Sequence, residues 1–479
     1  MSSEEGIKTK KAQDFGKWYL EVISKSDVVD ERVPIKGSNI LMPTGMEMWH
    51  AMMDRLDELL KGIGVQNYYF PLFIPEKLLK KEAAHFKGFV PEVAWVTHAG
   101  KTKLSERMAI RPTSEIIMYE MFKLWIRSYK DLPLKVNQYA NIVRWDTKMT
   151  KPLIRDREFL WHETHSAHAT EEEADKEVKV ALGIYNKLVS GMLGLEYLEL
   201  DRPEWDRFPG AEQSVALDAV MPDGKILQVG TVHNLGQKFS QAVGIRFVDK
   251  DGNKRLPYQL SYGIATRLIG AVVGIHGDDK GLIIPPAAAP VQIVIVPIYT
   301  NESKSKVMQK CGEILGRLEE KDFRVHLDAR EQYTPGYKFH EWELKGVPVR
   351  IEIGPKDIEK GQVTLVRRDF LERIAVPEDK LEEQLLEVMD SIGFQLQKRA
   401  KELLKVSDAK DLKEIKNKAE DGGFIRVDFC MKESCAKKLK TQTQLSVRGN
   451  LFGKNEKAGK TCAVCGKAAK EKVYLAHAY

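Results

Sequence analysis

The chain has 479 residues, of which 43% are hydrophobic and 30% charged, and its formal net charge is +6. A chain of this length exceeds what one hydrophobic core organises, so we expect two to four domains of ordinary globular composition. Five cysteines exclude a disulfide scaffold, and the mild positive charge permits an anionic partner without requiring one. The sequence has neither a secretory signal nor an apolar run long enough to cross a membrane, which predicts a cytoplasmic protein without membrane contact.

A helix followed by an aromatic strand is predicted near the start of the chain. Thr44 and Glu47 have the spacing of a capping box, which indicates a helix that runs to about Leu60. The segment VQNYYFPLFIP (65–75) then has the composition of a strand. We interpret the pair as scaffold, and an exposed apolar helix–strand pair would also suit a subunit interface.

The segment RPTSEIIMYEMFKLW (111–125) predicts an amphipathic helix that opens with Thr113, Ser114 and Glu115. Taken alone, Thr113 is best explained as the N-cap of that helix.

Charged and aromatic residues gather in RWDTKMTKPLIRDREFLWHETHSAH (144–168). Strand-like sequence on both sides of a polar loop predicts an antiparallel hairpin, and side chains alternate between the faces of each strand. The residues that share a face are Arg144 and Asp146 on the first strand, and Arg157, Phe159, Trp161, Glu163 and His165 on the second. A surface hairpin with cross-strand ion pairs is the alternative, but this set is what a small amphipathic ligand needs.

Two later segments add polar groups. ILQVGTVHNLGQKFSQ (226–241) predicts a strand that carries Gln228, Thr231 and His233. In SYGIATRLIGAVVGIHGDD (261–279), small residues precede Arg267 and an apolar helical run follows it. Taken alone, an arginine at a helix start is a solvated residue.

The Pro/Ala-rich stretch 283–290 predicts a domain boundary. Strands and helices then alternate over about 100 residues, as in a small α/β domain. From Pro377 the chain is helical and charged, and from about residue 405 it is Lys-rich.

Four of the five cysteines lie near the C-terminus, as Cys430-x4-Cys435 and Cys462-x2-Cys465. This spacing predicts a four-thiolate zinc site. Because thiolates fill every position, the metal would be structural rather than catalytic.

In their order along the chain, these segments resemble the three motifs of class II aminoacyl-tRNA synthetases. The helix and strand up to Pro71 resemble motif 1, residues 144–168 motif 2, and GIATRLIG motif 3. Within that class, RPTSE, REFLWHETHSAH, LQVGTVHNLGQ and SYGIATR are similar to prolyl-tRNA synthetases of the archaeal and eukaryotic type, over nearly the whole chain.

The resemblance implies a mixed α/β (α+β) protein with three domains. These are an antiparallel-sheet catalytic domain over 1–285, an α/β anticodon-binding domain over 286–400 and a small zinc-containing α/β domain over 401–479. The implied activity is a ligase that activates L-proline with ATP and Mg²⁺ and transfers it to the 3′ end of tRNA(Pro). The implied protein is a homodimer, and no role for DNA is expected.

The resemblance also implies roles for individual residues. The catalytic residues would be Arg144 and Arg267. The ATP-binding residues would be Arg144, Asp146, Arg155, Gln228, Thr231 and Arg267, with Gln228 near a magnesium ion. The proline-binding residues would be Thr113, Glu115, Arg144, Trp161 or Phe159, Glu163, His165, His233 and Ser261. The anticodon-reading residues would be Glu343, Arg350 and Lys356, for which a solvated strand edge is the plainer interpretation.

Two departures and three alternatives accompany this reading. Motif 2 usually has Glu where this chain has Asp146, and the span before LQVGT is too short for an inserted editing domain, so no editing in cis is expected. A threonine, serine or histidine synthetase is the nearest alternative, although zinc-held threonine recognition needs ligands and the predicted catalytic part contains no cysteine. An inactive synthetase-like module would tend to lose Arg144, Arg155 and Arg267, and a zinc-dependent nucleic-acid-binding protein leaves the hairpin unexplained.

Overall fold

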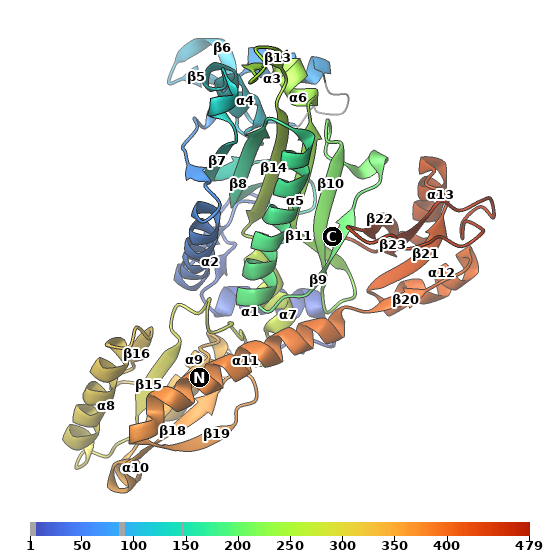
Figure 1. Ribbon diagram of the computed structural model, residues 1–479. Helices are drawn as coiled ribbons and strands as arrows, with labels where there is room; N and C mark the ends of the chain where they lie inside the picture. Colours follow the sequence, from blue (N-terminus) through green and yellow to red (C-terminus); the bar gives the residue numbers. More distant parts are fainter. Residues whose placement is uncertain (1–5, 86–91, 146) are drawn as a thin grey trace.

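The computed structural model describes residues 6–85, 92–145 and 147–479 and has three lobes, each with its own hydrophobic core (Figure 1). We define the first lobe as residues 6–285, the second as 286–403 and the third as 404–479. In Figure 1 the second lobe lies below the first, and the third lies beside it.

A single sheet runs through the first and third lobes. Among the described residues it contains eleven strands, in the order β20-β21-β23-β22-β9-β10-β11-β14-β8-β7-β3. The strands of the first lobe are β3 (Gln66–Asn67), β7 (Leu134–Val143), β8 (Glu158–His168), β9 (Tyr197–Asp201), β10 (Gln213–Val220), β11 (Ile226–Gly236) and β14 (Tyr258–Ala265). Except at β3, neighbours in this lobe pair antiparallel, which confirms the expected sheet.

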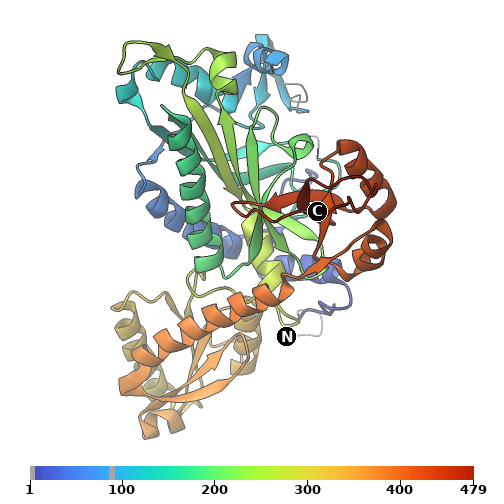
Figure 2. The ribbon, with the colours of Figure 1, turned by 45° about the vertical axis from the view of Figure 1, so that its right-hand side comes forward.

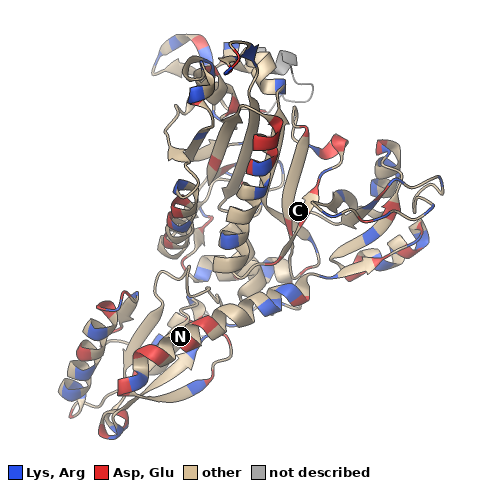
Figure 3. Ribbon diagram, in the orientation of Figure 1, with Lys and Arg blue, Asp and Glu red and all other residues tan. Residues whose placement is uncertain are grey.

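Helices cover the apolar face of this sheet. They are α1 (Phe15–Lys25), α2 (Pro43–Lys61), α5 (Glu171–Tyr185, followed by a π-helical segment Asn186–Met192) and α7 (Arg267–His276). α5 begins after Thr170, whose hydroxyl accepts the Glu173 N–H. Its first turn holds three glutamates, visible as acidic residues at one end of the helix in Figure 3, and they complement the positive end of the helix dipole.

Shorter elements complete the first lobe. They are β1 (Val29–Asp30), β2 (Ile40–Leu41), β4 (Phe73–Pro75), α3 (Glu76–His85), β5 (Trp95–Ala99), β6 (Thr102–Ile110), α4 (Glu115–Trp125), α6 (Lys238–Val243), β12 (Phe247–Val248) and β13 (Lys254–Arg255).

Two predictions for residues 43–75 are wrong in detail. α2 begins at Pro43 after Met42, which makes no side-chain capping bond, so Thr44 and Glu47 are not a capping box. Proline supplies the start instead, because its fixed φ suits the first helical position. The predicted aromatic strand is reduced to the short strands β3 and β4.

The second lobe is the predicted α/β unit. Its sheet has the order β16 (Val325–Leu327), β15 (Ile293–Pro297), β17 (Val349–Ile353), β18 (Gln362–Arg367) and β19 (Arg373–Pro377). Its helices are α8 (Lys304–Glu319), α9 (Pro335–Leu344), α10 (Pro355–Lys360) and α11 (Leu381–Leu403). β15 pairs parallel with both β16 and β17, and helices make these crossovers, as parallel pairs require.

The predicted boundary at 283–290 is a buried connection. Ala288 and Ala289 are fully buried in the core of the first lobe, whereas Ile283 belongs to the core of the second. The Arg324 guanidinium donates to the carbonyl oxygens of Ala289 at 2.8 Å and Pro286 at 2.9 Å. The segment is therefore held on both sides.

α11 is amphipathic, with a buried row that includes Leu385, Ile392 and Leu396, and it leads from the second lobe to the third. In the part of the chain that the structure describes, no helix combines the length and the apolar character needed to cross a membrane.

The third lobe adds its strands to the edge of the first lobe's sheet (Figure 2). Its elements are β20 (Val406–Asp408), α12 (Leu412–Lys418), β21 (Phe424–Phe429), α13 (Glu433–Thr443), β22 (Ser446–Leu451) and β23 (Glu471–Ala476). The junction is β22 against β9, where Asn450 pairs with Asp201 and Leu451 with Leu200. Gly449 has φ +121°, and a Cβ there would overlap the Asp201 carbonyl. Only glycine lets the two backbones approach so closely.

We expect Gly449→Ala to open this junction. Backbone strain of about 1–3 kcal/mol adds to the steric overlap, so hydrogen exchange at the β22 and β9 amides should accelerate. Gly453→Ala is the matched control, because Gly453 also has positive φ (+68°) but open space around it. Equal protection of β9 in both variants would contradict the assigned role of Gly449.

Candidate active site

A cavity of about 340 Å³ lies on the polar face of the first-lobe sheet. Its walls come from β8, β11 and β14, from the starts of α4 and α7 with the residues just before them, and from two loops. Along β14, Ser261, Gly263 and Ala265 line the cavity, whereas Leu260 belongs to the core on the other face, and Tyr262 and Ile264 are core residues that also contribute to the cavity wall. The predicted alternation is therefore present, although the cavity reaches two of the core residues.

The structure brings all the predicted proline-binding residues to this cavity. They are Thr113, Glu115, Arg144, Phe159, Trp161, Glu163, His165, His233 and Ser261. The hairpin that carries most of them is confirmed as β7 and β8, although its first strand already ends at Val143, one residue before Arg144.

One end of the cavity is a buried acidic cluster. Ligand atoms of Glu115, Glu163 and His165 lie within 4.8 Å of one another, and all three residues are buried. Thr113 donates its hydroxyl proton to Glu115, so it is not the N-cap of α4; Ser114 holds that position.

Neighbouring side chains fix the geometry of this cluster. The Gln138 amide donates to Glu163 Oε1 at 2.6 Å. His165 Nε2 lies 3.2 Å from Glu163 Oε2, and its Nδ1 lies 2.9 Å from the Tyr119 hydroxyl. Every group of the cluster is thereby held before a ligand arrives.

Burial and neighbouring charges shift the pKa values of two histidines in opposite directions. Burial opposes a charge on His165, but the hydrogen bond with Glu163 and the charge of Glu115 outweigh it and raise the pKa of His165. For His233, burial and the charges of His165 and Arg144 act together and lower its pKa to about 3. His233 is therefore neutral, and its Nδ1 lies 2.8 Å from the Ser214 hydroxyl.

Aromatic rings form one wall. Trp161 and Phe159 contact each other edge to face, with centroids 6.3 Å apart. The indole N–H of Trp161 is buried and has no hydrogen-bond partner among the described residues. An unsatisfied buried donor is costly, so this N–H is a candidate contact for a bound ligand.

The other end of the cavity is basic. The Arg144 guanidinium lies 5.6 Å from the Trp161 ring centroid. Arg267 opens α7 and donates to the carbonyl oxygens of Ile154 at 2.9 Å and Gln228 at 3.0 Å. Burial, and then the charges of Arg144 and Arg155, lower the pKa of Arg267 to about 10, so it remains charged at neutral pH. These arginines suit an anionic ligand.

The remaining predicted ATP contacts divide into three groups. Gln228 and Thr231 line the cavity. Arg155 is exposed outside the cavity wall, although its charge acts on Arg267. Asp146 lies outside the described residues.

Sequence reasoning did not find several residues of the cavity wall. They are Asp156, Asp206, Arg207 and Phe208. Phe208 stacks near His233, with ring centroids 4.9 Å apart. Asp206 to Phe208 lie in the irregular segment between β9 and β10, where no periodicity indicates direction. Asp156 lies in the hairpin segment 144–168, two residues before β8. Because it belongs to the loop and not to a strand, the alternation of side chains does not predict which way it faces.

Two of the three anticodon candidates are paired with each other. Glu343 lies in the last turn of α9 and Arg350 lies in β17, an interior strand, and their side chains are 3.1 Å apart and buried. The interpretation of Glu343 and Arg350 as residues of a solvated strand edge is therefore wrong. Lys356 is exposed in the first turn of α10.

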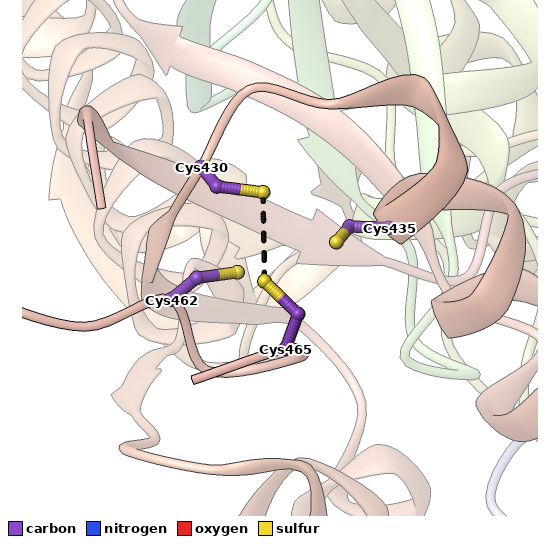
Figure 4. Close-up of side chains that lie close together, drawn as sticks. All are labelled: Cys430, Cys435, Cys462 and Cys465. Carbon is purple, nitrogen blue, oxygen red and sulfur yellow. Dashed lines mark hydrogen bonds between the residues drawn. The ribbon is translucent and has the colours of Figure 1, made fainter. Parts of the chain in front are cut away.

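The four C-terminal cysteines converge in the third lobe. Their sulfur atoms lie within 4.8 Å of one another, and Figure 4 shows them turned toward a common centre. The Sγ atoms of Cys430 and Cys465 are 3.9 Å apart. Zinc–sulfur bonds of about 2.3 Å in a tetrahedron place two sulfurs about 3.8 Å apart, so the cluster fits a zinc ion.

Three family profiles match the chain in sequence. Residues 97–276 match the tRNA synthetase class II core domain (G, H, P, S and T), and residues 292–388 match an anticodon binding domain. Residues 412–479 match the C-terminal domain of prolyl-tRNA synthetase. Proline–tRNA ligase of Alkaliphilus oremlandii is 45% identical over 469 residues, which cover 97% of this chain and 96% of that protein.

Two solved structures share the whole fold. Prolyl-tRNA synthetase from Cryptosporidium parvum, complexed with halofuginone and AMPPNP, has a TM-score of 0.94 and 37% identity and covers 100% of both chains. Prolyl-tRNA synthetase of Giardia lamblia, in complex with prolyl-adenylate, has a TM-score of 0.95 and 37% identity, with 99% of this chain and 100% of that chain covered.

The Asp156 carboxyl, beside Arg267, gives a prediction about pH. Burial raises the pKa of Asp156 to about 7, against the opposing effects of the Leu153 N–H and the Asn39 amide. The folded state therefore binds a proton more tightly than the unfolded chain, and this stabilisation disappears as the pH rises from about 4 to 7.

Asp156→Asn mimics the protonated form, so its melting temperature relative to the unmodified protein should rise across that pH range and then level off. Differential scanning fluorimetry of both proteins from pH 4 to 8 measures this difference. A difference independent of pH would show that Asp156 does not titrate as inferred.

Proposed function

The chain belongs to the prolyl-tRNA synthetase (proline–tRNA ligase) family of class II aminoacyl-tRNA synthetases, and we propose how its own side chains divide that reaction. The enzyme activates L-proline with ATP to prolyl-adenylate and transfers the prolyl group to tRNA. One observation carries the proposed assignment: a single cavity has a buried acidic cluster at one end and arginines at the other.

The acidic end would hold the ring nitrogen of proline. A secondary ammonium offers two N–H donors, and Glu115 and Glu163 are carboxylates held ready to accept them. The same three groups could ligate a metal ion, but both ring nitrogens of His165 already have partners, Glu163 and the Tyr119 hydroxyl. Trp161, Phe208 and the neutral His233 would enclose the proline ring, with Ser261 at the edge of the site.

The basic end would bind the reacting oxygens. Proline's carboxylate is already ionised at neutral pH, so its attack on the α-phosphorus needs no strong base. Arg144 would bridge that carboxylate and the α-phosphate, and Arg267 would hold the remaining phosphates, with Arg155 at the rim. As the new oxygen–phosphorus bond forms, pyrophosphate leaves with the electron pair of the broken bond.

Magnesium would enter with ATP and neutralise phosphate charge. Gln228 does not offer it a ligand in this arrangement. Arg202 can only donate, and its Nη2 lies 3.0 Å from Gln228 Oε1, so one lone pair of that oxygen is used and the guanidinium charge beside it disfavours a second cation. We therefore assign Gln228 and Thr231 to the nucleotide itself.

In the second step a terminal ribose hydroxyl of tRNA would attack the carbonyl carbon of the adenylate, and AMP would leave. The second lobe would read the anticodon. The paired Glu343 and Arg350 would have to exchange partners to contact a guanine, whereas the exposed Lys356 suits a phosphate.

The remaining proposals concern organisation. We propose domains over 1–285, 286–400 and 401–479, with one family match in each. A structural Zn²⁺ in the third lobe, a homodimer that uses the region of α2, and a cytoplasmic location stay predictions, as does the absence of editing in cis.

Amino-acid-dependent exchange between ATP and pyrophosphate tests the proposed site. Exchange should be strongest with proline, and Arg144→Ala should lower its rate about 100-fold or more, because a preorganised charge at the transition state is lost. Lys148 lies in the same loop, so Lys148→Ala is a suitable control and should keep its exchange rate. An Arg144→Ala variant with unchanged exchange would refute the role of Arg144.

Metal analysis tests the zinc proposal. The purified protein should hold about one zinc per chain, and Cys435→Ser should lose most of it and expose the third lobe to proteolysis. Cys311→Ser is the matched control, because Cys311 is a buried thiol in the second lobe, outside the cluster. Equal zinc content in the two variants would exclude this cluster as the site.

A further inference from the structure

Asp218 is a fully buried carboxylate between two arginines from different lobes. Arg202 donates to its two oxygens at 2.9 and 2.8 Å. Arg448 donates to the same two oxygens at 2.8 and 3.1 Å. Both pairs are bidentate, so the carboxylate has no rotational freedom and the two guanidinium groups are fixed around it.

Arg202 connects this triad to the cavity. The same Nη2 atom that contacts Asp218 also donates to Gln228 Oε1 at 3.0 Å. The Gln228 side chain lines the cavity, and because its oxygen is engaged, its amide N–H₂ is the group available to a ligand. The Gln228 main-chain oxygen accepts from Arg267, so both ends of this residue are held.

Two β-bulges orient side chains of the Arg202–Asp218–Arg448 triad. The register of β10 and β11 shifts between Leu217 and Asp218, which places Asp218 opposite Gln228. The register of β22 and β23 shifts between Val447 and Gly449, with Arg448 as the extra residue. A bulge redirects a side chain relative to the regular strand, and this one directs Arg448 across the lobe junction.

The charges of Arg202, Asp218 and Arg448 stabilise one another, so the loss of one affects the other two. Burial would raise the pKa of Asp218, but Arg202 and Arg448 outweigh burial and hold it below its ordinary value. The main-chain oxygen of Arg448 also accepts from Arg202. Removal of Arg448 would therefore leave a buried carboxylate half satisfied and allow Asp218 and Arg202 to shift together, which would loosen the contact of Arg202 with Gln228.

We propose that Arg448 of the third lobe is a positioning residue for amino-acid activation, which fixes Gln228 for ATP through Asp218 and Arg202. This inference rests on the proposed contact of Gln228 with the nucleotide. It means that ATP affinity depends on the third lobe being seated against β9.

The test measures KM separately for ATP and for proline in ATP–pyrophosphate exchange. Arg448→Gln should raise KM for ATP about tenfold and leave KM for proline within twofold. Arg448→Lys, which can restore one of the two hydrogen bonds, should fall between. Arg426→Gln is the matched control: Arg426 is also paired bidentately, with Asp408 at 2.7 and 3.0 Å, in the same lobe, but it has no contact with the triad.

A double-mutant cycle separates positioning from loss of structure. If Arg448 acts through Gln228, Arg448→Gln should have no further effect on KM for ATP in a Gln228→Ala background. Additive effects, or equal increases in both KM values, would overturn the proposal. An unchanged KM for ATP in Arg448→Gln would also overturn it. If the glutamine variant does not fold, the KM for ATP of Arg448→Lys provides the same test.

The single variant Gln228→Ala distinguishes the two levels of inference. A raised KM for ATP in Gln228→Ala, together with a normal value in Arg448→Gln, would refute the positioning role of Arg448. The contact between Gln228 and the nucleotide would still hold. A normal KM for ATP in Gln228→Ala would refute the nucleotide contact, and with it the positioning role of Arg448.

Discussion

The alternation of side chains along the central antiparallel strands is the constraint on which the rest of this protein depends. One face of β8, β11 and β14 packs against α2, α5 and α7, so every second residue is committed to the core. The opposite face is left for groups that would destabilise a core, and the cavity on that side is lined by two glutamates, two histidines and three arginines. Core packing on one side thereby supplies the rigidity that catalysis needs on the other.

Separation of charge within that cavity determines what it can bind. The buried acidic cluster and the arginines line the same cavity, and Arg144 lies over the aromatic rings of Phe159 and Trp161. A ligand that is cationic at one end and anionic at the other satisfies both without moving either. The opposite pKa shifts of His165 and His233 show how far burial and neighbouring charge, rather than residue type, set the chemistry of each position.

Much of the site could be predicted from the sequence, because period-two alternation and motif order are local signals. β8 places its predicted residues as expected, and the cysteine spacing found a cluster whose members are up to 35 residues apart. Phe208 was missed because an irregular loop positions it, and the Arg202–Asp218–Arg448 triad was missed because its members lie far apart in sequence. Thr44 and Thr113 were misread as caps because proline and the Glu115 carboxylate compete for those local roles.

The buried connection between the first two lobes has a consequence for how the partner RNA is recognised. Residues 283–290 are packed and clamped by Arg324, and Arg368 of the second lobe grips Asp278 of the first at 2.7 and 2.8 Å. The two lobes therefore cannot swing apart as bodies on a flexible tether do. The anticodon loop and the acceptor end therefore have to reach two sites whose separation is fixed. A tRNA is then selected by its dimensions as well as by its bases.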